Sequence, residues 1–174
     1  EPQPISSNFF LFSEYFSKNS THNEVVSCVP VPNASPGSIS ITISLFSGIL
    51  MLIGKKLGVK KVVGIDIDEK VRDVVLENFS KNDINDDFEV IIGNLVDDVN
   101  EKYDLVVSNI LVDVLEKLLE DIEKTLEKGA TVIFSGILNE KEEAFVKKAE
   151  NYNLKQIDRR EKNNWVSLVF KYEN

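Results

Sequence analysis

The polar residues at the ends of predicted strands are the ones in this chain most able to do chemistry. Asp66 ends the apolar segment KVVGID, Asn94 follows the next predicted strand, and Asn109 ends the segment DLVVSN. Open parallel sheets bind their ligands at the carboxyl ends of the strands. A carboxylate at such an end can accept hydrogen bonds from both ribose hydroxyls of an adenosine ligand, which is the chemistry that Asp66 suggests.

Each of these residues also has an ordinary structural interpretation, and the sequence leaves both open. Asp66 can be a solvated strand end beside Asp68, which is placed to cap the next helix. Asn94 can meet an adenine edge or simply occupy a turn. Asn109 can orient a polar group of a substrate through its carbonyl oxygen, or cap the helix that follows it.

The elements that would position these residues alternate between strand and helix. Apolar spacing predicts helices at 48–57 (closed by Gly58), 69–79, 111–126 (stopped by Gly129) and 139–150 (capped by Asn139). Strands are predicted at 61–66, 88–92, 104–109, 131–134, 154–160 and 165–170, the last two joined by Glu-Lys-Asn-Asn as a hairpin. This order predicts an α/β, Rossmann-like fold: a mostly parallel sheet with a C-terminal antiparallel hairpin.

Composition narrows the classes of function. The formal charge of -9 argues against a nucleic-acid-binding surface, and the longest apolar run, 41–53, is too short to span a membrane. The single cysteine, Cys28, excludes a disulfide framework and makes a reducing cytoplasm the expected location. With one histidine, His22, the chain offers no metal-ligand spacing and no convincing catalytic dyad.

Several segments together resemble one family, the ribosomal protein L11 methyltransferases. These are KKLGVKKVVGIDID, DLVVSNIL, the leucine-rich helix after it, GATVIFSGIL and NNWVSLVFK, which cover about residues 47–174 in order. The resemblance implies a class I methyltransferase that uses S-adenosylmethionine to methylate amino groups of a basic ribosomal protein. Nucleic-acid and membrane partners are not expected, because of the net charge and the short apolar run described above. It implies that Asn109 contacts the substrate amine and that the cofactor, if its site is intact, meets Ser47, Gly48, Asp66, Ile67, Asn94 and Leu95. At Asn94 the family more often has aspartate.

Two departures from the family are expected to matter. The family's separate N-terminal substrate-recognition domain is expected to be missing. The family's first cofactor motif, D-x-G-x-G-S-G, aligns with Thr42, Ser44, Phe46, Ser47 and Gly48, so the acid and two glycines are replaced. Side chains at Ser44 and Phe46 should block the close approach of backbone and cofactor for which glycine is used.

The composition of residues 1–46 suggests an origin for this change. If their coding DNA is reverse-complemented with the frame moved by one base, the strand read from Ser44 back to Val25 permits D-I-V-I-D-I-D-P-G-L-A-F-G-T-G-T-H-E-T-T. Read from Ser7 back to Glu1, it permits L-D-I-G-C-G-S. Both resemble family segments, so we hypothesise an inverted gene segment, which sequencing of the coding DNA would test.

The sequence therefore predicts two regions and leaves two functions open. Residues 1–37 form an irregular or atypical segment, and 38–174 form the methyltransferase-like domain, in which Ile39, Ile41, Ile43 and Leu45 alternate as a strand that can complete the sheet. The first function is methyl transfer to an amine, impaired by the altered motif. The alternative is a non-catalytic remnant of the fold that no longer binds the cofactor.

Overall fold

The computed structural model describes residues 39–44 and 48–174, and its centre is a seven-stranded sheet in the order β3-β2-β1-β4-β5-β7-β6. All neighbouring strands from β3 to β5 are parallel, whereas β7 runs antiparallel to β5 and to β6. The strands are β1 (Ile39–Ser44), β2 (Lys61–Asp66), β3 (Phe88–Ile92), β4 (Tyr103–Asn109), β5 (Leu126–Leu138), β6 (Leu154–Lys162) and β7 (Trp165–Tyr172). The predicted fold class is confirmed.

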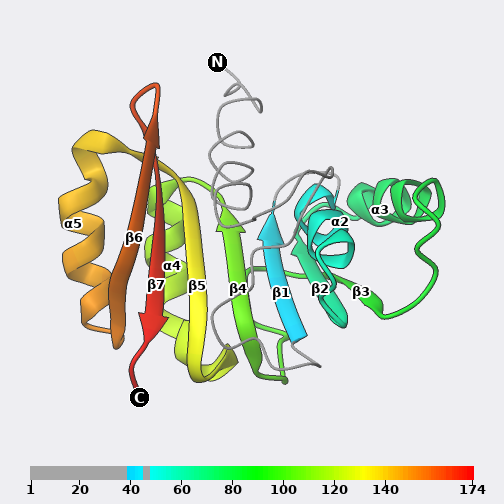
Figure 1. Ribbon diagram of the computed structural model, residues 1–174, viewed down its shortest axis with the longest axis horizontal. Coiled ribbons are helices and arrows are strands. Elements are labelled where there is room, and N and C mark those ends of the chain that lie inside the picture. Colours follow the sequence, from blue (N-terminus) through cyan, green and yellow to red (C-terminus); the bar gives the residue numbers. More distant parts are fainter. Residues whose placement is uncertain (1–38, 45–47) are drawn as a thin grey trace, which may run out of the picture.

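Helices cover both faces of this sheet (Figure 1). They are α2 (Ile49–Lys56), α3 (Lys70–Ser80), α4 (Val112–Asp121), the short 3₁₀ helix η1 (Ile122–Thr125) and α5 (Asn139–Glu150). One core cluster joins α4 and α5 to the sheet through side chains such as Val106, Leu115 and Phe134, while α2 packs on the other face against Leu105 and Val107. Alternate residues of each strand therefore face opposite layers, as the pleat requires.

The strand predicted in the N-terminal part of the chain lies in the middle of the sheet. β1 pairs in parallel with β2 on one side and with β4 on the other, as the alternating pattern of residues 39–45 predicts. β2 and β3 begin and end where they are predicted. The expected irregular segment 1–37, Ser47 and the products of the hypothetical inversion before residue 39 lie outside the described residues.

The helix predicted over 111–126 is confirmed as α4, but its predicted C-terminal end and the stop at Gly129 are wrong. α4 ends at Asp121, a 3₁₀ turn follows, and β5 already begins at Leu126, which pairs with Tyr103 of β4. Leu126 is fully buried, so its helical spacing from Ile122 reflects burial rather than helix. Gly129 lies inside β5, which is longer than the predicted 131–134 because β4 and β7 pair with it on both sides.

The two predicted helix caps have different outcomes. The carboxylate of Asp68 accepts a hydrogen bond from the backbone N–H of Lys70 at 3.0 Å, although the residue in the N-cap position of α3 is Glu69. Asn139 does not cap α5: it is the first residue of the helix, after Leu138. Its side chain instead donates to Glu161 and accepts from Arg159, so it joins α5 to β6.

The terminal hairpin has a tighter turn than predicted. The strands continue to Lys162 and restart at Trp165, which leaves Asn163 and Asn164 as a two-residue loop with φ values of 52° and 68°. Positive φ at both central residues is the signature of a type I′ turn, which favours Asn followed by Gly. The predicted four-residue loop Glu-Lys-Asn-Asn is therefore wrong, because its first two residues, Glu161 and Lys162, belong to β6.

Replacing Asn164 by glycine should stabilise the chain. The left-handed backbone conformation is unfavourable for a residue with a side chain but not for glycine. We therefore expect the free energy of unfolding to rise by about 0.5–1 kcal/mol. Urea denaturation followed by circular dichroism measures this change. Asn164→Ala is the control, since alanine lacks asparagine's tolerance of positive φ, and it should destabilise the chain. A glycine variant no more stable than the parent would contradict the assignment of the turn.

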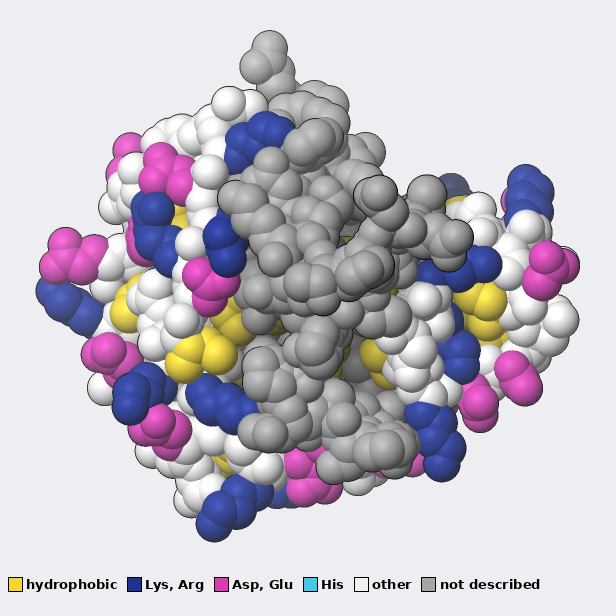
Figure 2. All heavy atoms as spheres, in the orientation of Figure 1, with side chains coloured by type: hydrophobic (Ala, Val, Ile, Leu, Met, Phe, Trp, Pro, Cys, Tyr) yellow, Lys and Arg dark blue, Asp and Glu magenta, His cyan; other side chains and the backbone are white. Residues whose placement is uncertain are grey.

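The surface of the described part mixes charges of both signs. Figure 2 shows basic and acidic side chains interspersed over one face, and many pair, such as Lys148 with Glu116 and Arg159 with Glu142. Within residues 39–44 and 48–174, every helix is too short or too polar to cross a bilayer.

Candidate functional site

The candidate site lies where the strand order of the sheet reverses, between β1 and β4. The chain runs outward from β1 to β2 and β3 on one side and from β4 to β5 on the other. At the carboxyl edge Ser44 of β1 is in register with Asn109 of β4, which is itself in register with Ser135 of β5, and Asp66 is in register with Ile92 of β3. The crevice at such a reversal is the usual ligand site of an open α/β sheet.

Asp66, the last residue of β2, is buried, and one of its two carboxylate oxygens has no hydrogen-bond partner among the described residues. Its side chain is 5% exposed. Oδ1 accepts a hydrogen bond from the backbone N–H of Asp68 at 3.0 Å, while Oδ2 has no hydrogen-bond partner among the described residues. Burial raises the pKa of this carboxyl above its usual value, the nearby charge of Asp68 adds to the rise, and the hydrogen bond from Asp68 opposes it. A buried acceptor without a donor is costly unless a ligand supplies one.

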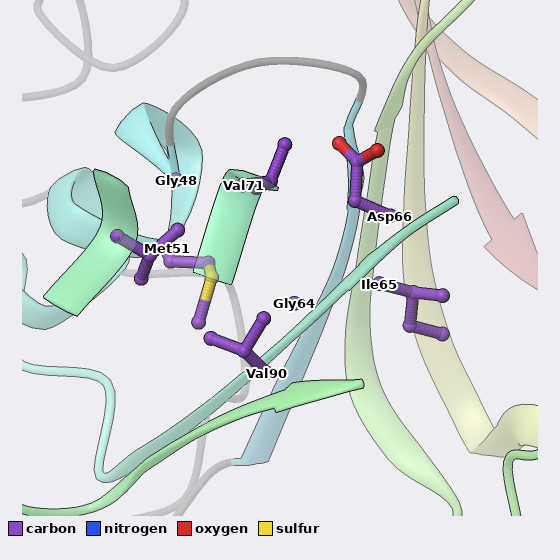
Figure 3. A pocket seen from close by; sticks show the side chains of 8 residues that line it. Gly48, Met51, Gly64, Ile65, Asp66, Val71 and Val90 are labelled. Atoms are coloured by element: carbon purple, nitrogen blue, oxygen red, sulfur yellow. The ribbon is translucent and has the colours of Figure 1, made fainter. Parts of the chain in front are cut away.

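A small hollow adjoins Asp66 on the α2 side of the sheet (Figure 3). In this view the carboxylate stands at the end of β2 near Val71, and Ile65 points away from Met51. Gly48, before α2, has φ +68°, and a β-carbon on it would lie 2.6 Å from Cγ2 of Val75. Glycine at this position therefore lets the start of α2 approach α3 closely, beside the hollow.

A larger cleft opens on the other side of Asp66, between the ends of β2 and β3 and helix α4. It encloses about 660 Å³, within the roughly 300–1,000 Å³ usual for small-ligand sites. Ile67, 65% exposed, gives it an apolar surface next to the carboxylate. Asn94 donates from its side chain to Asp97 at 3.2 Å, and Leu95 has φ 51°. The other lining residues include Gly93, Ile110, Val114 and Lys117.

Asn109 lies at the carboxyl end of β4, half-buried, and its amide is held by β5. Oδ1 accepts a hydrogen bond from the hydroxyl of Ser135 at 3.0 Å. Asn109 is not among the residues that line the larger cleft, but the next residue, Ile110, is. The side chain of Asn109 lies on the α2 side of the sheet, as that of Val107 does, whereas Ile110 belongs to the core cluster on the α4 side and lines the cleft.

Comparison with known proteins agrees with this geometry. The model of the ribosomal protein L11 methyltransferase family matches residues 38–173. The chain belongs to this family. The L11 methyltransferase of Thermotoga petrophila is 36% identical over 135 residues, which are 78% of this chain and 50% of that protein. That of Clostridium perfringens is 38% identical over 125 residues, 72% of this chain and 40% of the relative. The chain thus spans about half the length of these relatives or less.

The solved structures include one from the same family. The ribosomal protein L11 methylase of Lactobacillus delbrueckii subsp. bulgaricus superposes with a TM-score of 0.76 at 26% identity, over 82% of this chain and 73% of that one. The predicted resemblance to the L11 methyltransferase family is therefore confirmed, together with its fold.

The structure places four of the six residues predicted for the cofactor on the larger cleft and a fifth on the hollow that adjoins it at Asp66, while Asn109 ends β4 with its side chain on the α2 side. Asp66, Ile67, Asn94 and Leu95 line the larger cleft, and Gly48 lines the smaller hollow that shares Asp66. Ser47 lies outside the described residues. Whether the six bind a cofactor remains a prediction.

Sequence reasoning missed two residues of β5 next to Asn109. Ser135 is 1% exposed and bonds to Asn109, and Gly136 has φ +90° against the backbone of Ile110. Both lie in the segment SGIL, which directly follows the predicted strand 131–134 and to which sequence reasoning assigned no functional role. The pairing of β4 with β5 sets which residue faces Asn109, and the sequence alone does not give that register.

Proposed function

We propose that this chain is an S-adenosylmethionine-binding domain that methylates amino groups of a ribosomal protein, as the name of its family indicates. The observation that carries the proposal is that Oδ2 of Asp66, a residue 5% exposed at the carboxyl end of β2, has no hydrogen-bond partner among the described residues. A ribose hydroxyl would donate the hydrogen bond that this oxygen lacks. Membership of the L11 methyltransferase family over residues 38–173 supports the choice of cofactor.

The residues at the cleft suit the parts of such a cofactor. Asp66 would accept from the ribose, Ile67 and Leu95 would provide apolar contacts for the adenine, and Asn94 would meet its polar edge. S-adenosylmethionine, when bound, supplies a methyl group on a positively charged sulfur. Asn109 would orient the attacking amine, so that the chain contributes mainly by positioning the reactants.

The altered first motif favours weakened binding. β1 continues as a strand through Ser44, which pairs with Asn109, where the family's pattern has a glycine. A side chain at this point hinders close approach of the backbone to the cofactor. The second candidate function, a non-catalytic remnant of the fold, rests on this observation and differs from the first in predicting no binding at all.

Calorimetric titration of S-adenosylhomocysteine into the purified chain tests the proposal. Binding in the micromolar range supports a cofactor site that works despite the replaced glycines. A chain that unfolds cooperatively and shows no heat of binding would instead support the remnant. The methyl acceptor is tested separately, by transfer of labelled methyl groups to ribosomal protein L11.

Replacing Asn109 by alanine should separate binding from transfer. We expect S-adenosylhomocysteine to bind within twofold of the parent, because Asn109 lies outside the lining of the larger cleft. The rate of methyl transfer should fall by about 10–100-fold, the value of one or two lost hydrogen bonds to the reacting amine. Stopped assays of methyl incorporation measure the rate, and an unchanged rate would remove Asn109 from the site.

A further inference from the structure

Ser135 has no role in the function proposed so far, yet it is the residue that holds the side chain of Asn109. Its hydroxyl is 1% exposed and lies 3.0 Å from Oδ1 of Asn109. The two residues are in register on β4 and β5. They also share a face of the sheet, since Val107 and Ile133, two residues before each, belong to one core cluster on the α2 side.

The hydroxyl of Ser135 has one proton and two acceptors within reach. The amide oxygen of Asn109 lies at 3.0 Å and the backbone carbonyl of Ser108 at 3.5 Å, so the shorter bond is the stronger one. A bond to Oδ1 fixes the amide with its oxygen toward β5. If the proton went to Ser108, the hydroxyl would accept from Nδ2 instead, and the amide would be turned by half a rotation.

The backbone next to Asn109 is held by the same part of β5. The register of β5 with β7 shifts between Ser135 and Ile137, and Gly136 within this irregularity has φ +90°. A β-carbon on Gly136 would overlap the carbonyl oxygen of Ile110 and lie 3.1 Å from its carbonyl carbon. Two consecutive residues of β5 therefore contact two consecutive residues at the end of β4, one through a side chain and one through the backbone.

We propose that Ser135 is a positioning residue that sets the orientation of the Asn109 amide toward the amine substrate. With one lone pair of Oδ1 occupied by Ser135, the second lone pair is free to accept an N–H of the amine. Accepting that hydrogen directs the lone pair of the amine nitrogen elsewhere, which is needed for attack on a methyl group. The catalytic role of this contact rests on the function proposed above. The orientation of the Asn109 amide by Ser135 does not depend on that function.

Nuclear magnetic resonance of the folded chain tests the orientation without any need for activity. The side-chain Nδ2H₂ signals of Asn109 are assigned as those that disappear in Asn109→Ala. In Ser135→Ala we expect these signals to shift or broaden, because the amide loses the bond that fixes it. Ser108→Ala is the matched control: it removes a buried hydroxyl from the neighbouring strand that has no hydrogen-bond partner among the described residues.

Methyl transfer and ligand binding supply the second readout. Ser135→Ala should lower kcat about tenfold, the loss of roughly one hydrogen bond, and leave the affinity for S-adenosylhomocysteine within twofold. Ser108→Ala should leave both unchanged. If Ser135→Ala does not fold, Ser135→Cys takes its place, because its thiol is a weak donor of nearly the same size.

The outcomes separate this inference from the proposed function. Asn109 signals in Ser135→Ala that match those of the parent would overturn the positioning role, whatever the activity. A chain that transfers no methyl group, but whose Asn109 signals respond to Ser135→Ala and not to Ser108→Ala, would overturn the proposed function and keep the contact. An equal loss of kcat in both variants would indicate a general effect of removing a buried hydroxyl, and would also overturn the role.

Discussion

Replacing Asp66 by asparagine is expected to make the ligand-free chain more stable and its binding of S-adenosylhomocysteine about 100-fold weaker. The loss of affinity follows from two charge-assisted hydrogen bonds to ribose hydroxyls that become neutral ones, each about half as strong. The gain in stability follows from burial. The carboxylate is 5% exposed and Oδ2 has no donor among the described residues, so the ionised side chain is poorly solvated in the ligand-free fold.

The pH dependence of stability gives an independent check. Because the pKa of Asp66 is raised in the folded chain, the folded state binds more protons than the unfolded state between the usual value of 3.8 and the raised value. The contribution of Asp66 to stability therefore falls as pH rises through this window. Asparagine does not titrate, so the difference in Tm between Asp66→Asn and the parent should be small near pH 3.8 and grow until the raised pKa is passed.

Asp68→Asn provides the matched control for both measurements. It makes the same chemical change two residues later, at an exposed side chain that accepts a hydrogen bond from Lys70, a bond that asparagine can also accept. We expect its affinity to stay close to that of the parent and its Tm to rise less than that of Asp66→Asn, because only the repulsion between the two carboxylates is removed and Asp66 still titrates. Calorimetric titration and thermal unfolding at several pH values give both quantities. Equal affinities of Asp66→Asn and the parent would exclude Asp66 from the site.

The sequence was sufficient to predict the strands that carry the site. Apolar segments such as 61–66 and 88–92 are short, buried and bounded by polar residues, so local pattern and final structure agree. The strand at 39–44 was also predicted from alternation alone, although its surroundings differ from the family's pattern. The polar residues that end these strands then meet at one edge because the sheet is parallel.

What the sequence did not predict depends on contacts between distant segments. Leu126 has the spacing of a helix face but belongs to a strand, since pairing with Tyr103 outweighs its local preference. Asn139 is a residue type that often caps helices, but its side chain accepts a hydrogen bond from Arg159 of β6 instead. The contact of Ser135 with Asn109 likewise requires the register of β4 and β5, which no local pattern contains.

Replacing Gly136 by alanine should destabilise the chain more than any other glycine substitution at the carboxyl edge of the sheet. Two costs add. The left-handed φ of +90° is unfavourable for alanine by about 1–2 kcal/mol. The new β-carbon would also overlap the backbone carbonyl of Ile110, which no side-chain rotation can relieve, and strain of this kind costs about 1–3 kcal/mol. We therefore expect the free energy of unfolding to fall by roughly 2–5 kcal/mol.

Gly58→Ala isolates the first of these costs. Gly58 has nearly the same dihedral, φ +86°, but a β-carbon there would meet nothing within 4 Å. It should lose only the 1–2 kcal/mol of the left-handed conformation. The difference between the two variants in urea denaturation then measures the contact between β5 and Ile110. Equal losses would mean that the end of β4 moves freely away from β5. In that case Gly136 would not hold the backbone beside Asn109. The orientation of the side-chain amide of Asn109 would then depend on Ser135 alone.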